Sequence, residues 1–126
     1  MKLKTGTVYI HYDFPVIFSA TNEEGNIFIC LFANETNSCL RYLCREVSSS
    51  LFADLENNKK DIRSIFENSE KLYSITLNAQ SEEPIEAVET TEDISSFLPD
   101  KDLFIGNREG GTSKPIDIPS YSYATA

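Results

Sequence analysis

The stretch YDFPVIFSATNEEGNIFICLF, residues 12–32, carries the clearest pattern in the chain and decides the expected fold. Two apolar runs, residues 15–20 and 27–33, flank a short acidic turn. Pro15 cannot donate a hydrogen bond to a sheet, so it belongs at a strand start or a bulge. Gly25 is the residue expected at positive φ in the turn. The pattern predicts an antiparallel hairpin.

Further strands are predicted on either side of this hairpin. In residues 6–12, Val8 and Ile10 are expected to share one face. Strand patterns also occur at residues 39–47 and 71–77. The chain is therefore expected to form an antiparallel meander of about five strands.

Residues 48–68 have helical spacing instead. Ser48 can cap a first helix and Asp61 a second, because each side chain can accept from the free amides of a first helical turn. The second helix would present an apolar stripe to the sheet, formed by Ile62, Ile65 and Phe66. Two short helices packed on the meander make the expected fold class α+β.

The composition favours one domain. The 126 residues are 40% hydrophobic and 25% charged, which is a globular balance. We expect a single α+β domain over residues 1–105, with an acidic segment at 80–100 outside the core and a last short strand at 103–105. Residues 106–126 are rich in Gly, Pro, Ser and Tyr, which predicts an extended tail.

The net charge is −9, from 20 acidic against 11 basic residues. This balance argues against direct nucleic-acid binding, which needs clustered Lys and Arg. It favours a protein partner with a basic surface, or solubility alone. No stretch approaches the roughly 18 apolar residues of a membrane span. Three cysteines without a signal sequence fit reduced thiols in the cytoplasm, and the oligomeric state stays open.

An acidic row is the first candidate for partner binding. Its carboxylates recur at spacings of about three and could imitate phosphates in a basic groove; the alternative is a solvated edge that prevents aggregation. The tail offers tyrosines as a second contact. The candidate residues are Glu82, Glu83, Glu86, Glu89, Glu92 and Asp93 in the row, and Tyr121 and Tyr123 in the tail.

Signals for enzyme chemistry are weak. His11 and Asp13 lie two residues apart, so on a strand Asp13 could orient the imidazole toward Cys44 or a serine; a plain surface pair is the alternative. Cys39 and Cys44 with one histidine lack the ligand set of a structural zinc site. No Gly-rich phosphate loop is present. We expect no catalytic residue, no metal and no cofactor.

Residues 12–31, with the pattern Y-D-x-P, two apolar residues, F-x-A, a Gly turn and an apolar strand, resemble a small bacterial and phage domain family of unknown function. The resemblance covers about residues 8–78, with a weaker similarity at 98–103. The helix start at Val47-Ser48 and the second helix at 61–66 also fit. The resemblance implies a fold and carries over no catalytic residues.

These observations lead to three hypotheses. The first is a non-enzymatic protein-binding module, an accessory, inhibitor or antitoxin-like partner of a basic, nucleic-acid-acting protein in a bacterial or phage conflict system. The second is a small-ligand sensor with a pocket between sheet and helices, lined by Tyr12, Tyr42 and Phe66. The third is an enzyme that uses His11 and Asp13.

Overall fold

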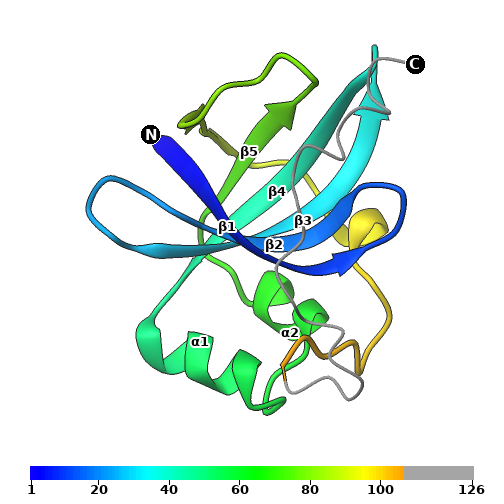
Figure 1. The fold of residues 1–126 in the computed structure, drawn as a ribbon. Helices are drawn as coiled ribbons and strands as arrows, with labels where there is room; N and C mark the ends of the chain where they lie inside the picture. Colours follow the sequence, from blue (N-terminus) through cyan, green and yellow to red (C-terminus); the bar gives the residue numbers. More distant parts are fainter. Residues whose placement is uncertain (107–126) are drawn as a thin grey trace.

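The computed structural model describes residues 1–106, and its centre is a seven-stranded antiparallel sheet (Figure 1). The first five strands follow one another in the sheet as they do in the chain, which confirms the meander. The elements are β1 (Lys2–His11), β2 (Pro15–Thr21), β3 (Ile27–Thr36), β4 (Cys39–Val47), α1 (Ser49–Glu56), α2 (Ile62–Glu67) and β5 (Leu72–Leu77), followed by a 3-10 turn, η1 (Ser95–Phe97).

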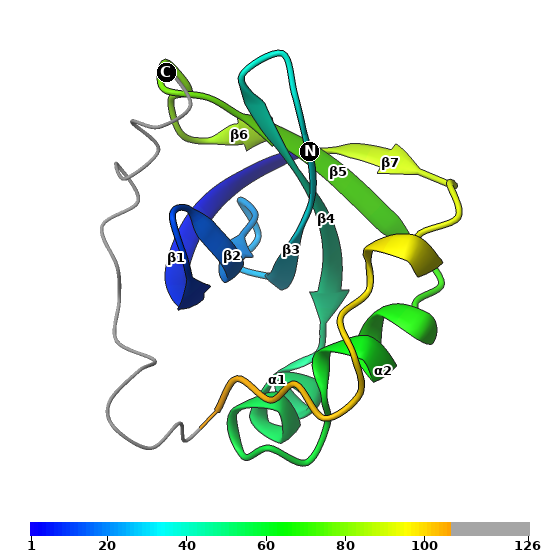
Figure 2. The ribbon, with the colours of Figure 1, turned by 90° about the vertical axis from the view of Figure 1, so that its right-hand side faces the viewer.

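The remaining strands, β6 (Ile85–Glu86) and β7 (Val88–Thr90), come from the acidic segment. They lie at opposite edges of the sheet, in the order β6-β1-β2-β3-β4-β5-β7, and Ala87 alone separates them in the chain. This short segment therefore joins both edges and curls the sheet into a barrel-like ring (Figure 2). The expectations of about five strands and of an acidic segment outside the core were wrong.

The reason for that error is that β6 and β7 are too short to show periodicity. They are held by long-range pairing, with β6 on the first residues of β1 and β7 on the start of β5. Ile85 and Ala87 are buried in the ring, 8% and 3% exposed. An apolar residue that fills a ring closed by distant strands leaves no local signature in the sequence.

One apolar cluster fills the inside of the ring. Tyr42 belongs to it, is fully buried, and donates a 2.6 Å hydrogen bond from its hydroxyl to the carbonyl of Pro15. The ring of Phe18 meets it edge-on at 4.9 Å. The cluster is Leu3, Val8, Phe18, Ala20, Phe28, Cys30, Leu40, Tyr42, Cys44, Ile75, Leu77, Ile85 and Ala87.

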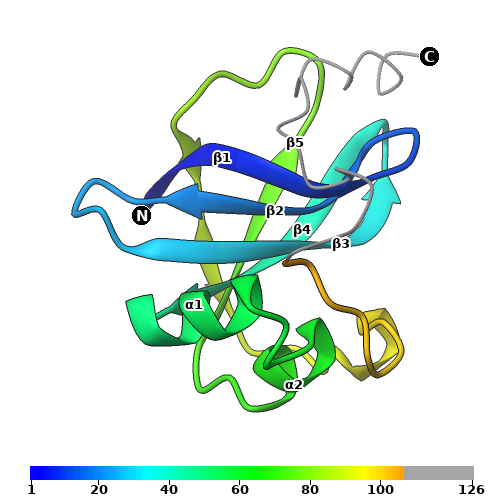
Figure 3. The ribbon, with the colours of Figure 1, turned by 60° about the horizontal axis from the view of Figure 1, so that its bottom comes forward.

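A second cluster fills the space between the sheet and the two helices, which cover the opposite face (Figure 3). From the sheet it contains Tyr9, Ile17, Ile29, Leu31, Leu43 and Val47, and from the helices Leu55, Ile62, Ile65 and Phe66. Strand β3 contributes to both clusters, as its nearly continuous apolar sequence predicts.

The strand β1 departs from simple alternation. Its register against β2 shifts between Thr5 and Val8 and again between Val8 and Ile10. Val8 consequently faces the ring interior, whereas Ile10 packs with the cluster under the helices. The prediction that these two residues share a face was wrong, because a bulge reverses the side of every residue after it.

Both predicted helix caps are confirmed. The Ser48 hydroxyl accepts from the Leu51 amide at 3.1 Å, and the Asp61 carboxylate accepts from the Ser64 amide at 2.8 Å. These caps matter because α1 and α2 have only eight and six residues, and helices this short are not stable alone. Packing and capping therefore keep them in place.

Residues 94–106, which we call the strap, cross the helices. Ile94 and Ile105 are buried in the helix-facing cluster. The Ile62 amide donates to the carbonyl of Leu103 at 3.0 Å. The strand predicted at residues 103–105 was wrong, because this part of the strap bonds to the start of α2 and not to a sheet edge.

The strap ends against α1. The Gly106 amide donates to the Asn58 side chain at 2.9 Å. A side chain at position 106 would overlap the backbone carbonyl of Glu56, so only glycine permits this close approach.

Candidate binding surfaces

The acidic row divides into carboxylates that hold the chain together and carboxylates that stay free. Glu83 accepts from the Thr5 amide at 2.9 Å and from the Thr5 hydroxyl. Glu86 accepts from the N-terminal amine at 2.7 Å and lies 3.5 Å from the ammonium of Lys2. The hydrogen bond from the amine lowers the pKa of Glu86. Both residues therefore fasten residues 83–90, which we call the closing segment, to β1 and to the N-terminal amine before it.

The last two members of the row also have structural partners. Glu92 forms an ion pair with Arg41. Asp93 accepts from the Ser95 amide at 3.0 Å, and this bond lowers the pKa of the carboxyl. Within residues 1–106, only Glu82 and Glu89 of the row are exposed without a hydrogen bond or ion pair. The row is therefore not one uniform surface for a partner.

Two further free carboxylates lie on the turn after β2. Asn22 organises this turn by accepting from the amides of Glu24 and Asn26, both at 3.0 Å. Gly25 has φ +86°, as predicted. Glu23 and Glu24 line a shallow hollow with Met1, Lys2 and Asn22. Adjacent acids in a turn are normally solvated, so the pair Glu23-Glu24 carries no signal for binding in the sequence.

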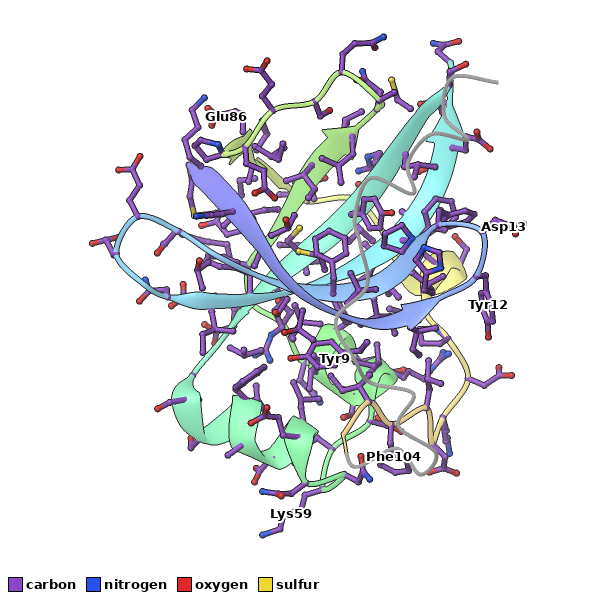
Figure 4. All side chains as sticks on the ribbon, viewed as in Figure 1. Tyr9, Tyr12, Asp13, Lys59, Glu86 and Phe104 are labelled. Carbon is purple, nitrogen blue, oxygen red and sulfur yellow. The ribbon has the colours of Figure 1, made fainter. Side chains whose placement is uncertain are left out.

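The residues of the enzyme hypothesis differ in burial. His11 is the last residue of β1 and is half-buried, whereas Asp13 lies at the exposed tip of the β1–β2 hairpin (Figure 4). Cys44 is fully buried in the ring, opposite Cys30 on the neighbouring strand, and burial raises the pKa of Cys30. A thiol inside the ring is not accessible to a substrate at the hairpin tip.

The predicted ligand pocket is not formed by the residues expected to line it. Tyr12 is 76% exposed, Tyr42 is buried inside the ring, and Phe66 belongs to the cluster under the helices. The sheet itself separates Tyr42 from Phe66. This lining was wrong because aromatic residues on successive elements were assigned to one side of the sheet.

A polar hollow of about 300 Å³ lies elsewhere, where β4 and β5 part. The last paired residues of these strands are Cys44 and Tyr73, and the chain before β5 turns away toward α2. The hollow is lined by Arg45, Glu46, Asn68, Ser69, Glu70, Lys71 and Tyr73. No motif marks it, since it results from where two strands stop pairing.

Three further expectations concern a metal, a membrane span and the tail tyrosines. Among residues 1–106, no group of three or more His, Cys, Asp or Glu side chains is arranged to hold a metal ion. In the same range, no helix is long and apolar enough to cross a membrane. Tyr121 and Tyr123 lie outside the described residues.

The fold and these surfaces define a small antiparallel β domain that is closed into a ring and covered on one face by two short helices. The chain belongs to DUF6575, a family of unknown function, whose model matches residues 1–125. The expected resemblance to an uncharacterised domain family is thus confirmed, over more of the chain than predicted. No curated protein and no solved structure matches the chain.

Proposed function

We propose that this chain is a non-enzymatic protein-binding module that binds a basic surface on its partner. The observation that carries the proposal is the excess of exposed, unpaired carboxylates. Lys2, Arg41 and Arg63 form internal ion pairs, and among the remaining charged side chains of the described part the unpaired carboxylates outnumber the unpaired cations, in keeping with the net charge of −9. These free carboxylates include Glu23, Glu24, Glu82 and Glu89.

The packing of the domain supports surface recognition. Side chains fill both faces of the sheet, and the hollow beside Met1 and the one beside Arg45 are open to solvent. A partner that acts on nucleic acid presents a basic surface suited to phosphates, and fixed carboxylates complement it. The proposed role is an accessory, inhibitor or antitoxin-like protein in the cytoplasm of a bacterium or in phage infection.

The test is capture of proteins from the native host by the purified chain at low and moderate salt. The binding variant is Glu82→Gln with Glu89→Gln, which neutralises the two free members of the acidic row. The matched control is Glu35→Gln with Asp100→Asn, which removes the same charge from exposed residues elsewhere.

We expect one basic protein to be captured by the wild type and by the control, less by the binding variant, and less as salt rises. Each captured protein is then purified and its affinity measured directly. Capture of nothing basic, or equal affinity for both double variants, contradicts the proposal.

A further inference from the structure

Two cysteines face each other across the middle of the sheet. Cys30 in β3 is the register partner of Cys44 in β4, and the same transverse row continues to Phe18 in β2 and to Tyr73 in β5. Both thiols are fully buried, and both residues belong to the cluster that fills the ring. The two side chains therefore lie on one face of the sheet, directly opposite each other.

The spacing of these two positions suits a disulfide. Register partners in antiparallel strands have Cα atoms about 4.5 or 5.5 Å apart, and disulfides join Cα atoms that are about 4.4–6.8 Å apart. Burial raises the pKa of Cys30, and the neighbouring thiol of Cys44 adds to the rise. This interaction places the two sulfur atoms beside each other, so a bond between them requires little movement of either strand.

The third cysteine has a different environment. Cys39 lies at the turn of the same hairpin, where its register partner is Thr36, and it is only half-buried. Its sulfur accepts a hydrogen bond from the Asn78 side chain at 3.6 Å. Cys39 and Cys44 lie far apart along one extended strand, and Cys30 is not opposite Cys39. The fold therefore allows one pairing of the three, between Cys30 and Cys44.

We propose that Cys30 and Cys44 are a redox site that forms a cross-strand disulfide, with a small-molecule disulfide such as oxidised glutathione as the oxidant. One cysteine thiolate attacks a sulfur of the oxidant and releases one glutathione. The other thiolate attacks the protein sulfur of this mixed disulfide and releases the second glutathione. The two cysteine sulfurs are oxidised, the two glutathione sulfurs are reduced, and the two thiol protons pass to the released glutathione thiolates.

Burial decides when this exchange takes place. Neither sulfur is accessible while the ring is closed, and β3 and β4 are each paired on both sides. Formation and reduction of the bond therefore both require the ring to open. The bond closes a loop over residues 30–44, which restricts the unfolded chain, whereas the native hairpin already holds the two ends together. The disulfide should consequently stabilise the ring.

The test equilibrates the full-length Cys39→Ala variant, in which Cys30 and Cys44 are the only thiols, with mixtures of reduced and oxidised glutathione. Alkylation and mass spectrometry then count the free thiols. We expect both thiols to be lost together, with no glutathione attached to the protein. The equilibrium constant for the disulfide should be about tenfold or more higher in native buffer than in concentrated urea, because a bond that stabilises the fold is favoured by the fold to the same extent.

The matched control is Cys44→Ala, which also has two thiols, but at positions that the register does not pair. It should form no disulfide within the chain in native buffer. A second measurement follows reduction of oxidised Cys39→Ala by dithiothreitol. Reduction should be slower in native buffer than in urea, because the closed ring shields the bond.

Circular dichroism reports the folding of each reduced variant before oxidation. If Cys44→Ala does not fold, the wild type replaces it as the control, and Cys39 should then be the one thiol that is still alkylated after oxidation. Three results overturn the proposal. They are retention of both thiols in Cys39→Ala, an equilibrium constant in native buffer no higher than in urea, and a disulfide within the chain of folded Cys44→Ala.

Discussion

The inside of the ring and the layer under the helices are both apolar, but they are assembled in different ways. The ring interior is lined by strands alone and closed by β6 and β7, which pair with both edges of the meander. The helix-facing layer combines sheet residues with two short helices and the strap. Polar contacts hold its pieces in place, among them the Asp61 cap and the bond from Gly106 to Asn58.

This difference predicts which parts of the molecule unfold cooperatively. Backbone pairing links every strand of the ring to its neighbours, so the interior can open only with the whole sheet. The outer layer has pieces that contact the sheet mainly through side chains. We therefore expect the ring to unfold as a unit and the strap to be released at lower free energy.

The largest effect is expected for Phe18→Ala, in the ring. Phe18 is fully buried and packs edge-on against Tyr42. Removing the ring leaves a cavity and should lower the free energy of unfolding by about 3–5 kcal/mol. Urea denaturation followed by circular dichroism measures it. Tyr12→Ala, at a position 76% exposed, is the aromatic control and should change stability by less than about 0.5 kcal/mol.

A smaller effect is expected for Ile105→Ala, in the strap. Ile105 is fully buried in the helix-facing layer, and its truncation should cost about 2–4 kcal/mol. Hydrogen exchange should show which part of the structure is destabilised. The amides of Ile62 and Gly106, which bond to or from the strap, should exchange faster, while those of Cys30 and Leu31 in β3 stay protected.

The contrast between the two regions would be contradicted if, in Ile105→Ala, hydrogen exchange at the β3 amides became faster by as much as at the amides bonded to the strap. In that case the two layers would unfold together. Gly106→Ala provides a second route to the same question, because its new side chain must displace the strap from Glu56 without leaving a cavity.

The sequence predicted the elements that have local signatures. The alternation in β4 placed Leu40, Tyr42 and Cys44 on one face, and all three lie inside the ring. Ser48 and Asp61 were identified as caps because their side chains act within their own turn. Such features depend on a few neighbouring residues, and these are visible in a single sequence.

The closing segment and the surfaces could not be predicted in the same way. Glu83 and Glu86 were interpreted as partner-binding acids, yet they bond to residues at the opposite end of the described chain. Arg45 and Lys71 carry no motif, and they line one hollow only because β4 and β5 stop pairing between them. Contacts between distant segments decide both cases.

The smallest effect, and the one that sharpens the contrast most, concerns Asp61. Its carboxylate accepts from the amides of Asp102 and Ser64, so one side chain caps α2 and holds the strap. The bond from Asp102 is the first cause of its lowered pKa, with the bonds from Ser64 adding to it. A carboxyl whose folded pKa is lowered stabilises the fold above its unfolded pKa, which is about 3.9.

Asp61→Asn keeps a capping oxygen but loses the charge, so it should cost about 0.5–1 kcal/mol at neutral pH. That difference from the wild type should shrink as the pH falls from about 4 toward the lowered folded pKa, because the carboxyl of the unfolded chain takes up its proton first. Urea denaturation at several pH values measures it, with Asp13→Asn at the exposed hairpin tip as the control. A difference that does not depend on pH would mean that shape alone, and not charge, joins the helix to the strap.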